Sequence, residues 1–253
     1  MENQKVETWM FRKEGEGFAL FIGILFTLLI SYFFYEINFW LFLGLVIVGL
    51  IYLKLLQAQQ LGNSIRIHEN QFPEIFEIFQ KYASKLEIEK ANLYIKQDPY
   101  LNAYTLGFGT CTVILNSALV EQLNLKELSF VISHELGHFK SGHTKITSLI
   151  NPLGQGNIFS NFVFGFWGRK AEYTCDRCGI ILTKDIDSAI SAIIKLSLGG
   201  ELFKKFNIDG YIPQLKKSES SLVKSSELLI DHPTITNRVK AMINYWNNNF
   251  KNK

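Results

Sequence analysis

The chain has 253 residues, of which 47% are hydrophobic and 19% are charged, and its formal net charge is +3. This composition excludes a disordered, collagen-like or low-complexity chain. The small positive charge gives no reason to expect a nucleic-acid partner, and we expect none. Three cysteines are too few, and odd in number, for a disulfide scaffold, which favours a reducing compartment.

The apolar residues are concentrated between Phe18 and Leu53, where Glu36 is the only charged residue. One helix of this length would be longer than a bilayer is thick, so we expect two helices, over 18–35 and 37–56. Aromatic residues crowd the expected turn between them, as they do at a membrane interface. The sequence therefore predicts a transmembrane helical hairpin.

Two other interpretations of the apolar segment are weaker. A signal peptide would be shorter and would be followed by a cleavage site of small residues. A buried hairpin of a soluble protein would have a polar face, which this segment lacks. A transmembrane hairpin that contacts the lipid bilayer remains the prediction.

Basic residues flank the apolar segment on both sides and are absent from its turn, which places both of its ends in the cytoplasm. We therefore expect an integral protein of the cell inner or plasma membrane. Its predicted parts are a cytoplasmic tail over 1–16, the hairpin over 17–56 and a cytoplasmic domain over 57–253.

After the hairpin, residues 57–70 are polar and are expected to form a linker, and Pro73 suits the first turn of a helix. Short strands are expected over 92–95 and 110–115. Asn124 begins a further helix, because a glutamate three residues later completes the spacing of a capping box.

Residues 151–168 are apolar but interrupted by proline and glycine, so we expect a loop or a membrane-touching flap there. The last expected elements are helices over 169–182, 186–198 and 234–246, and a serine-rich loop over 218–226. The predicted fold class is mainly α with a small β-sheet.

The helix that begins at Asn124 carries the sequence His134-Glu135-Leu136-Gly137-His138. Residues four apart lie on one face of a helix, so the two histidines can offer their imidazoles to one metal ion. Glu135 lies beside them and can accept a proton from water without binding the metal. The alternative is two surface histidines on an ordinary helix.

A catalytic zinc site has a third protein ligand, for which Glu172 is the candidate. Asp176 follows one turn later, so both carboxylates share a helix face, and it can accept a hydrogen bond from a ligand imidazole. A solvated acidic helix face is the alternative for this pair.

H-E-L-G-H followed by E-Y-T-C-D-R, after a two-helix hairpin, resembles the HtpX-like membrane zinc metallopeptidases. This gluzincin family includes the CAAX prenyl proteases. Three further segments resemble the family's motifs: Asn102-Ala103-Tyr104 its N-A-[FY] edge strand, His143 its histidine after the zinc motif, and His232-Pro233 with Arg238 its late H-P…R motif. The resemblance covers about residues 90–245.

The resemblance implies a gluzincin-type zinc metallopeptidase domain with one Zn²⁺ per chain and protein or peptide substrates. The site residues that it implies are His134, His138 and Glu172 as zinc ligands, Glu135 as general base, His232 and Arg238 as groups beside the oxyanion or the Glu172 carboxylate, Asp176 as partner of a ligand histidine, and Asn102, Ala103 and Tyr104 as the strand that pairs with substrate. For His143 we expect a structural or second-sphere role.

The family usually has a small residue where Cys175 and Cys178 stand. Cysteine is small and apolar enough to pack in their place, which we expect rather than a second metal or redox site.

The expected function is that of a membrane-anchored zinc metalloendopeptidase acting on membrane or misfolded proteins, with the oligomeric state left open. Three alternatives remain: a narrow-specificity processing peptidase, a proteolytically silent zinc-binding adaptor, and a metal-dependent hydrolase of non-peptide bonds. The adaptor predicts a damaged general base or a missing third ligand, whereas Glu135 and Glu172 are both present.

Overall fold

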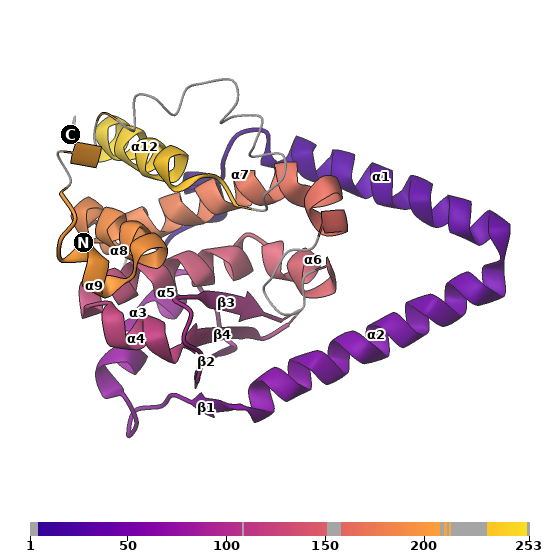
Figure 1. The fold of residues 1–253 in the computed structure, drawn as a ribbon, viewed down its shortest axis with the longest axis horizontal. Helices are drawn as coiled ribbons and strands as arrows, with labels where there is room; N and C mark the ends of the chain where they lie inside the picture. The colour runs from indigo at the N-terminus through magenta and orange to yellow at the C-terminus, as the bar shows by residue number, and fades with distance from the viewer. Residues whose placement is uncertain are drawn as a thin grey trace.

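The computed structural model describes residues 5–107, 109–150, 158–207, 210–211, 213 and 232–251, apart from the side chains of 148–150 and 158–162. Helices surround one small sheet (Figure 1). The helices are η1 (Thr8–Met10), α1 (Glu16–Ile37), α2 (Phe39–Gly62), α3 (Pro73–Lys85), α4 (Ser117–Gln122), α5 (Leu125–Lys140), α6 (His143–Ile150), α7 (Ile158–Thr183), α8 (Ile186–Leu198), α9 (Gly200–Phe203), α12 (Ile235–Trp246) and η3 (Asn247–Lys251). The strands are β1 (Ser64–Arg66), β2 (Ala91–Lys96), β3 (Ala103–Leu106) and β4 (Cys111–Asn116). The predicted fold class, mainly α with a small sheet, is confirmed.

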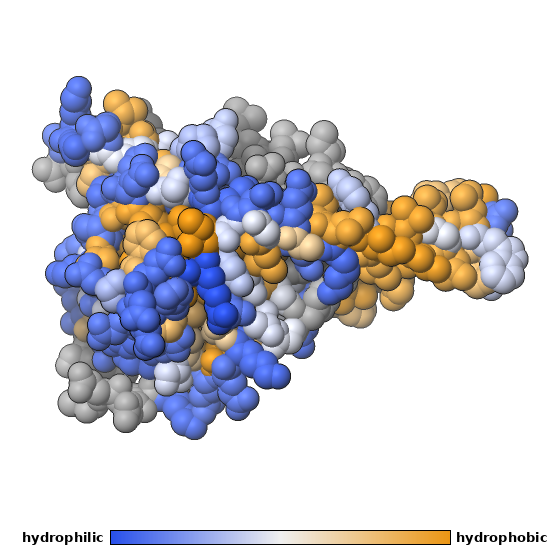
Figure 2. All heavy atoms as spheres, turned by 90° about the horizontal axis from the view of Figure 1, so that it is seen from below, coloured by the Kyte–Doolittle hydropathy of each residue, from blue (hydrophilic) through white to orange (hydrophobic). Residues whose placement is uncertain are grey.

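Helices α1 and α2 form the expected apolar hairpin. Asn38 has an extended backbone between them, and its side chain accepts a hydrogen bond of 3.0 Å from the backbone N–H of Leu41, which caps α2. Their 22 and 24 residues correspond to about 33 and 36 Å, enough to cross a hydrocarbon layer of about 30 Å. Figure 2 shows the hairpin as a hydrophobic projection from a mainly hydrophilic domain.

The linker expected over 57–70 is wrong over residues 57–66. Helix α2 continues to Gly62, and β1 then joins the sheet beside β2. Residues 54–61, which follow the apolar run, are good helix formers and include no glycine or proline. The helix therefore continues beyond its apolar part. The hairpin is therefore joined to the sheet without a flexible spacer.

The chain before α1 packs against the domain. Phe11 is fully buried in the main hydrophobic core, together with Val6. The backbone N–H of Val6 donates a hydrogen bond of 3.0 Å to the carbonyl of Lys85 at the end of α3. Both ends of the hairpin are thus fixed to the same body (Figure 1).

The sheet has the strand order β1-β2-β4-β3. β2 and β4 are parallel, and the two outer strands pair antiparallel with them. β4 is buried along its whole length, and β2 and β4 occupy the positions expected for strands. β3 is an end strand, so one of its edges faces no other strand within the described part of the chain.

Helix α7 begins at Ile158, earlier than the helix expected over 169–182. The loop or flap expected over 151–168 is therefore wrong over 158–168, and residues 151–157 lie outside the described part. The proline and the first two glycines of this stretch all precede Ile158. Its apolar residues Val163 and Trp167 are buried with Ala19 of α1, a contact that the local pattern does not reveal. The helices expected over 186–198 and 234–246 are present as α8 and α12, whereas 218–226 lies outside the described residues.

Helices α5 and α7 approach each other closely at small residues. A Cβ atom added at Gly137 of α5 would lie 3.0 Å from the Cβ of Cys178, and one added at Gly179 of α7 would lie 2.6 Å from the ring of Phe130. Cys175 and Cys178 are fully buried at this contact. The short separation lets side chains of the two helices meet.

We predict that Gly179→Ala lowers the free energy of unfolding by about 1–3 kcal/mol, the usual cost of overpacking a filled core. The new methyl group would clash with the ring of Phe130, which is buried and cannot move aside. Thermal unfolding of the detergent-purified protein measures the effect. Gly49→Ala in α2, where a Cβ meets nothing within 4 Å, is the matched control, and equal unfolding temperatures for both variants would contradict the prediction.

Candidate metal centre

The start of α5 is fixed by a complete capping box. The side chain of Asn124 accepts hydrogen bonds of 3.0 Å from the backbone N–H groups of Lys126 and Glu127, and Glu127 accepts one of 2.8 Å from the backbone N–H of Asn124. Glu127 also pairs with Lys195 of α8 at 2.8 Å. These contacts fix the first turn of α5. Further along the helix, its two histidines face Glu172 of α7.

His134, His138 and Glu172 bring three donor atoms together. The Nε2 atoms of the two histidines lie 3.2 Å apart, and they lie 3.4 and 3.3 Å from the two oxygens of Glu172. A tetrahedral zinc ion bound at 2.0–2.1 Å places neighbouring ligand atoms about 3.3 Å apart. The donor set and its spacing therefore fit one such ion.

Asp176 and Arg238 lie behind these donors. An oxygen of Asp176 is 3.0 Å from Nδ1 of His134, on the opposite side of the ring from Nε2. Arg238 of α12 donates two hydrogen bonds to Asp176, of 2.9 and 2.5 Å, and its third nitrogen lies 3.3 Å from Glu172. His232 approaches from outside, with its Nδ1 atom 3.3 Å from Glu172 and 58% of its side chain exposed.

These neighbours decide the charges of the buried groups. Burial alone would lower the pKa of His134, but the carboxylates of Asp176 and Glu172 raise it to about 10. Burial opposes ionisation of Glu172, yet His232 and Arg238 hold the pKa of this carboxyl well below its usual value. Arg238 and His134 likewise lower the pKa of Asp176 against the effect of burial. Both carboxylates are ionised and attract a cation, which must displace a proton from His134.

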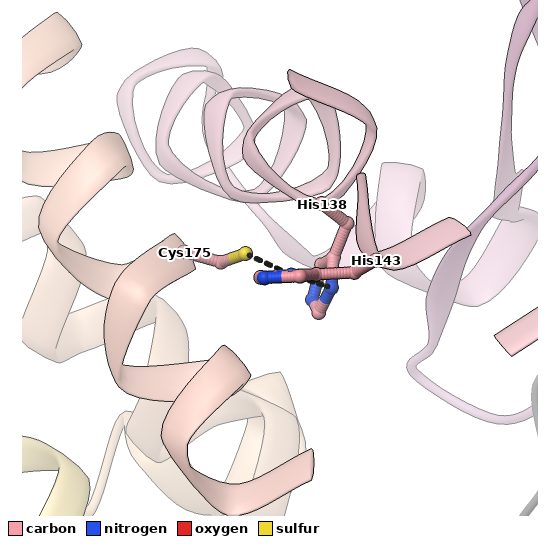
Figure 3. Close-up of side chains that lie close together, drawn as sticks. All are labelled: His138, His143 and Cys175. Carbon is pink, nitrogen blue, oxygen red and sulfur yellow. Dashed lines mark hydrogen bonds between the residues drawn. The ribbon is translucent and has the colours of Figure 1, made fainter. Parts of the chain in front are cut away.

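His143 lies on the other side of His138. Their Nδ1 atoms are 3.2 Å apart, and Nε2 of His143 lies 3.1 Å from a carboxylate oxygen of Glu16. Cys175 of α7 points towards His143, with its sulfur 3.6 Å from Nδ1 (Figure 3). Burial lowers the pKa of His143 to about 4, so the ring is neutral at pH 7. His138, His143 and Cys175 form a second group of side chains of metal-binding types.

Glu135 is held by the end strand of the sheet. The hydroxyl of Thr105 in β3 lies 2.8 Å from a carboxylate oxygen of Glu135 and 3.0 Å from its backbone carbonyl. Both residues are buried. Thr105 thus contacts both the backbone of α5 and the carboxylate of Glu135.

The residues of the N-A-Y segment lie at the start of the same strand. Ala103 pairs with Leu115 of β4, and the carbonyl of Asn102 accepts a hydrogen bond of 3.0 Å from the backbone N–H of Asn116. Tyr104 points to the opposite face from Thr105, and its hydroxyl donates a hydrogen bond of 3.0 Å to the side chain of Gln60 in α2. β3 therefore lies between the hairpin and the donor set.

Two site residues are missing from the sequence analysis. Thr105 could have been found, because residues two apart share a face of a strand and Ala103 was already singled out. Glu16 is the first residue of the apolar helix α1, and its buried carboxylate needs a partner. Nothing in the sequence indicated that His143 is that partner, because the two residues are 127 positions apart.

The fold and the site define a class of protein, one in which two histidines and a glutamate can hold a metal ion in a domain with two apolar N-terminal helices. The model of "Peptidase family M48" matches residues 69–166 and 153–245, more than half of the chain. The chain therefore belongs to peptidase family M48, which confirms the resemblance to HtpX-like metallopeptidases.

Individual relatives agree with this membership. The chain is 28% identical over 193 residues to the plastoglobule-localized metallopeptidase 48 of Arabidopsis thaliana, covering 70% of this chain and 56% of the relative. It is 23% identical to a protease HtpX homolog of Streptococcus pyogenes, covering 80% of this chain and 86% of the relative. The crystal structure of S. mikatae Ste24p shares the fold, with a TM-score of 0.51 and 17% identity over 87% of this chain and 62% of that one. The chain thus spans only part of the plant relative and of Ste24p.

We predict that Asp176→Asn weakens metal binding by roughly 10- to 100-fold, the usual effect of losing a carboxylate that orients a ligand histidine. Chelator competition on the purified protein measures the affinity. Asp187→Asn, on the exposed face of α8, is the matched control and is expected to bind metal as the wild type does. Unchanged affinity in Asp176→Asn would show that Asp176 does not orient His134.

Proposed function

We propose that the protein is a membrane-anchored zinc metalloendopeptidase that hydrolyses peptide bonds in membrane or misfolded proteins. The observation that carries this proposal is the spacing of the His134, His138 and Glu172 donor atoms, which fits one ion. Glu135 follows His134 in the same helix. Membership of peptidase family M48 supports it.

In this proposal His134, His138 and Glu172 hold one Zn²⁺ per chain. When bound, the ion polarises the scissile carbonyl and lowers the pKa of water. Glu135 accepts the proton of the attacking water and then delivers it to the departing amine. The contact with Thr105 keeps the Glu135 carboxylate in one orientation for both transfers.

Arg238 and His232 have different proposed roles. The guanidinium of Arg238 is engaged with Asp176 and Glu172, which supports a role in bracing these carboxylates. His232 is more exposed, which supports a role as a donor to the negative charge that develops on the substrate oxygen.

The substrate would bind as an extended segment along β3. The end position of this strand supports addition of one more strand through main-chain hydrogen bonds. Recognition of this kind depends mainly on an extended backbone, which unfolded proteins offer and folded ones do not. Asn102, Ala103 and Tyr104 are the proposed start of this contact.

The proposed location is the inner or plasma membrane, with the domain in the cytoplasm. Both ends of the hairpin lie at the domain, so a spanning hairpin places residues 1–16 and 57–253 on the same side (Figure 1). The distribution of basic residues favours the cytoplasmic side.

The proposed activity is tested with detergent-purified protein and an unfolded substrate such as casein. We predict that the wild type cleaves casein and that a chelator stops cleavage. Glu135→Gln should keep one zinc per chain and lose activity by at least about 100-fold, because general-base catalysis contributes roughly 10²–10⁴-fold. Metal content is measured on the same samples.

Three outcomes would count against the proposal. Full activity in Glu135→Gln would exclude Glu135 as the general base. Zinc binding without cleavage of proteins or peptides would favour the silent adaptor, and cleavage of esters alone would favour a non-peptide hydrolase.

We further predict that Thr105→Val lowers kcat roughly 10- to 100-fold, because a hydrogen bond to a charged group contributes about 1.5–3 kcal/mol. Thr105→Ser keeps the hydroxyl and should retain most activity. Zinc content should be the same in both variants, since Thr105 contacts Glu135 and none of the three donors through the bonds described. Equal kcat in Thr105→Val and Thr105→Ser would contradict this role.

A further inference from the structure

We propose that Glu16, the first residue of the apolar helix α1, is a positioning residue for the metal ligand His138 and acts on it through His143. This inference rests on the metal site proposed above. It adds that the membrane hairpin itself supplies part of that site.

A continuous chain of contacts joins the hairpin to the donor set. Nε2 of His143 lies 3.1 Å from Glu16, and Nδ1 of His143 lies 3.2 Å from Nδ1 of His138. Nε2 of His138, at the far end of its ring, faces His134 and Glu172. Glu16 and His143 are 3% and 2% exposed, so water does not compete for these contacts.

The positions of the protons on His143 and His138 follow from the Glu16 carboxylate at the end of this series of contacts. An ionised carboxylate can only accept, so the Nε2 atom of His143 must carry the hydrogen that faces Glu16. A neutral imidazole has one N–H group, which leaves a lone pair on Nδ1 of His143. His138 must then donate from its own Nδ1 atom, and its Nε2 atom keeps the lone pair that a metal ion needs.

Glu16 is held in place by further contacts. The hydroxyl of Thr174 in α7 donates a short hydrogen bond to its second carboxylate oxygen, and the same hydroxyl accepts one of 2.9 Å from the backbone N–H of Lys13. Nε of Arg12 lies 3.7 Å from the first oxygen. The dipole of α1 favours an acidic residue in its first turn, but this does not explain why the carboxylate is buried against His143.

Each ligand histidine thus has its own carboxylate. Asp176 reaches His134 directly, whereas Glu16 reaches His138 through the ring of His143. Carboxylate–histidine–metal arrangements of this kind fix the tautomer and the ring orientation of the ligand. The carboxylate of Glu16 comes from the apolar hairpin. The packing of α1 against α7 therefore affects metal affinity.

The group of His138, His143 and Cys175 could instead be taken as a second metal site (Figure 3). His138 would then have to bind an ion with both ring nitrogens and lose both N–H protons. The Cys175 sulfur lies 3.6 Å from Nδ1 of His143, whose lone pair accepts the hydrogen bond from His138. The contact of the thiol needs no ion, because a thiol is a weak donor that can share this lone pair with His138. The arrangement therefore favours hydrogen bonding over a second ion.

The experiment measures zinc affinity of the full-length, detergent-purified protein by chelator competition. We expect Glu16→Leu, which removes the acceptor, to bind zinc roughly 10- to 100-fold more weakly than the wild type. Glu16→Gln retains an acceptor oxygen and should show a smaller loss, of at least about threefold. Glu14→Gln is the matched control, because this carboxylate lies two positions earlier and is 81% exposed, and its affinity should be unchanged.

A double-mutant cycle separates positioning from a general structural effect. His143→Phe alone should weaken zinc binding, and Glu16→Leu should add no further loss in that background, because Glu16 acts through His143. Additive losses, or unchanged affinity in Glu16→Leu, would overturn the proposal. If Glu16→Leu does not fold, Glu16→Gln decides, and wild-type affinity in that variant would overturn it.

Cobalt substitution tests whether a metal ion binds instead at His138, His143 and Cys175. One Co²⁺ per chain without sulfur-to-metal charge-transfer absorption supports the proposal. A sulfur-to-metal band that disappears in Cys175→Ser would place the ion on Cys175 and overturn it. A wild-type protein that binds no metal would instead refute the proposed metal site, and an inactive protein with intact zinc affinity would refute only the proposed activity.

Discussion

The buried carboxylate of Glu172 is the interaction on which the rest of the site depends. It lies among His134, His138, His232 and Arg238, all within 3.4 Å. A charge removed from water in this way is costly unless it is paired. The pairing requires α5, α7 and the segment from His232 into α12 to meet at one point, so the site and the packing of the domain stabilise each other. The small residues Gly137 and Gly179 make this meeting possible, because they allow α5 and α7 to approach.

The sheet and the hairpin also contact α5 and α7. β3 reaches Glu135 through Thr105 on one face and α2 through Tyr104 on the other. α1 reaches α7 through Thr174 and Glu16. The groups with proposed chemical roles therefore lie between the apolar hairpin and the α-helical core, and few of them belong to a loop.

The local parts of this arrangement were predictable from the sequence. The capping box at Asn124, the helical spacing of His134 and His138, and the apolar hairpin with its turn at Asn38 each depend on residues close together in the chain. What could not be predicted depends on distant partners. The first turns of α7 were expected to be a loop because proline and glycine interrupt this stretch, and the helix is revealed only by its packing against α1. The burial of Glu16 likewise depends on His143, which lies far along the chain. The roles of the individual site residues stay predictions until the variants are measured.

The order of the site residues along the chain has a consequence for biogenesis. Glu16 and Arg238 lie far apart in the sequence, and both contact the cluster around the proposed zinc ligands. During synthesis the hairpin emerges well before α12, and contacts between such distant segments form late. The cluster is incomplete until the chain has been made as far as Arg238 and α1 packs beside α7. A nascent or wrongly inserted chain therefore lacks a finished site, so the proposed activity would begin only after α1 and α12 are both in place.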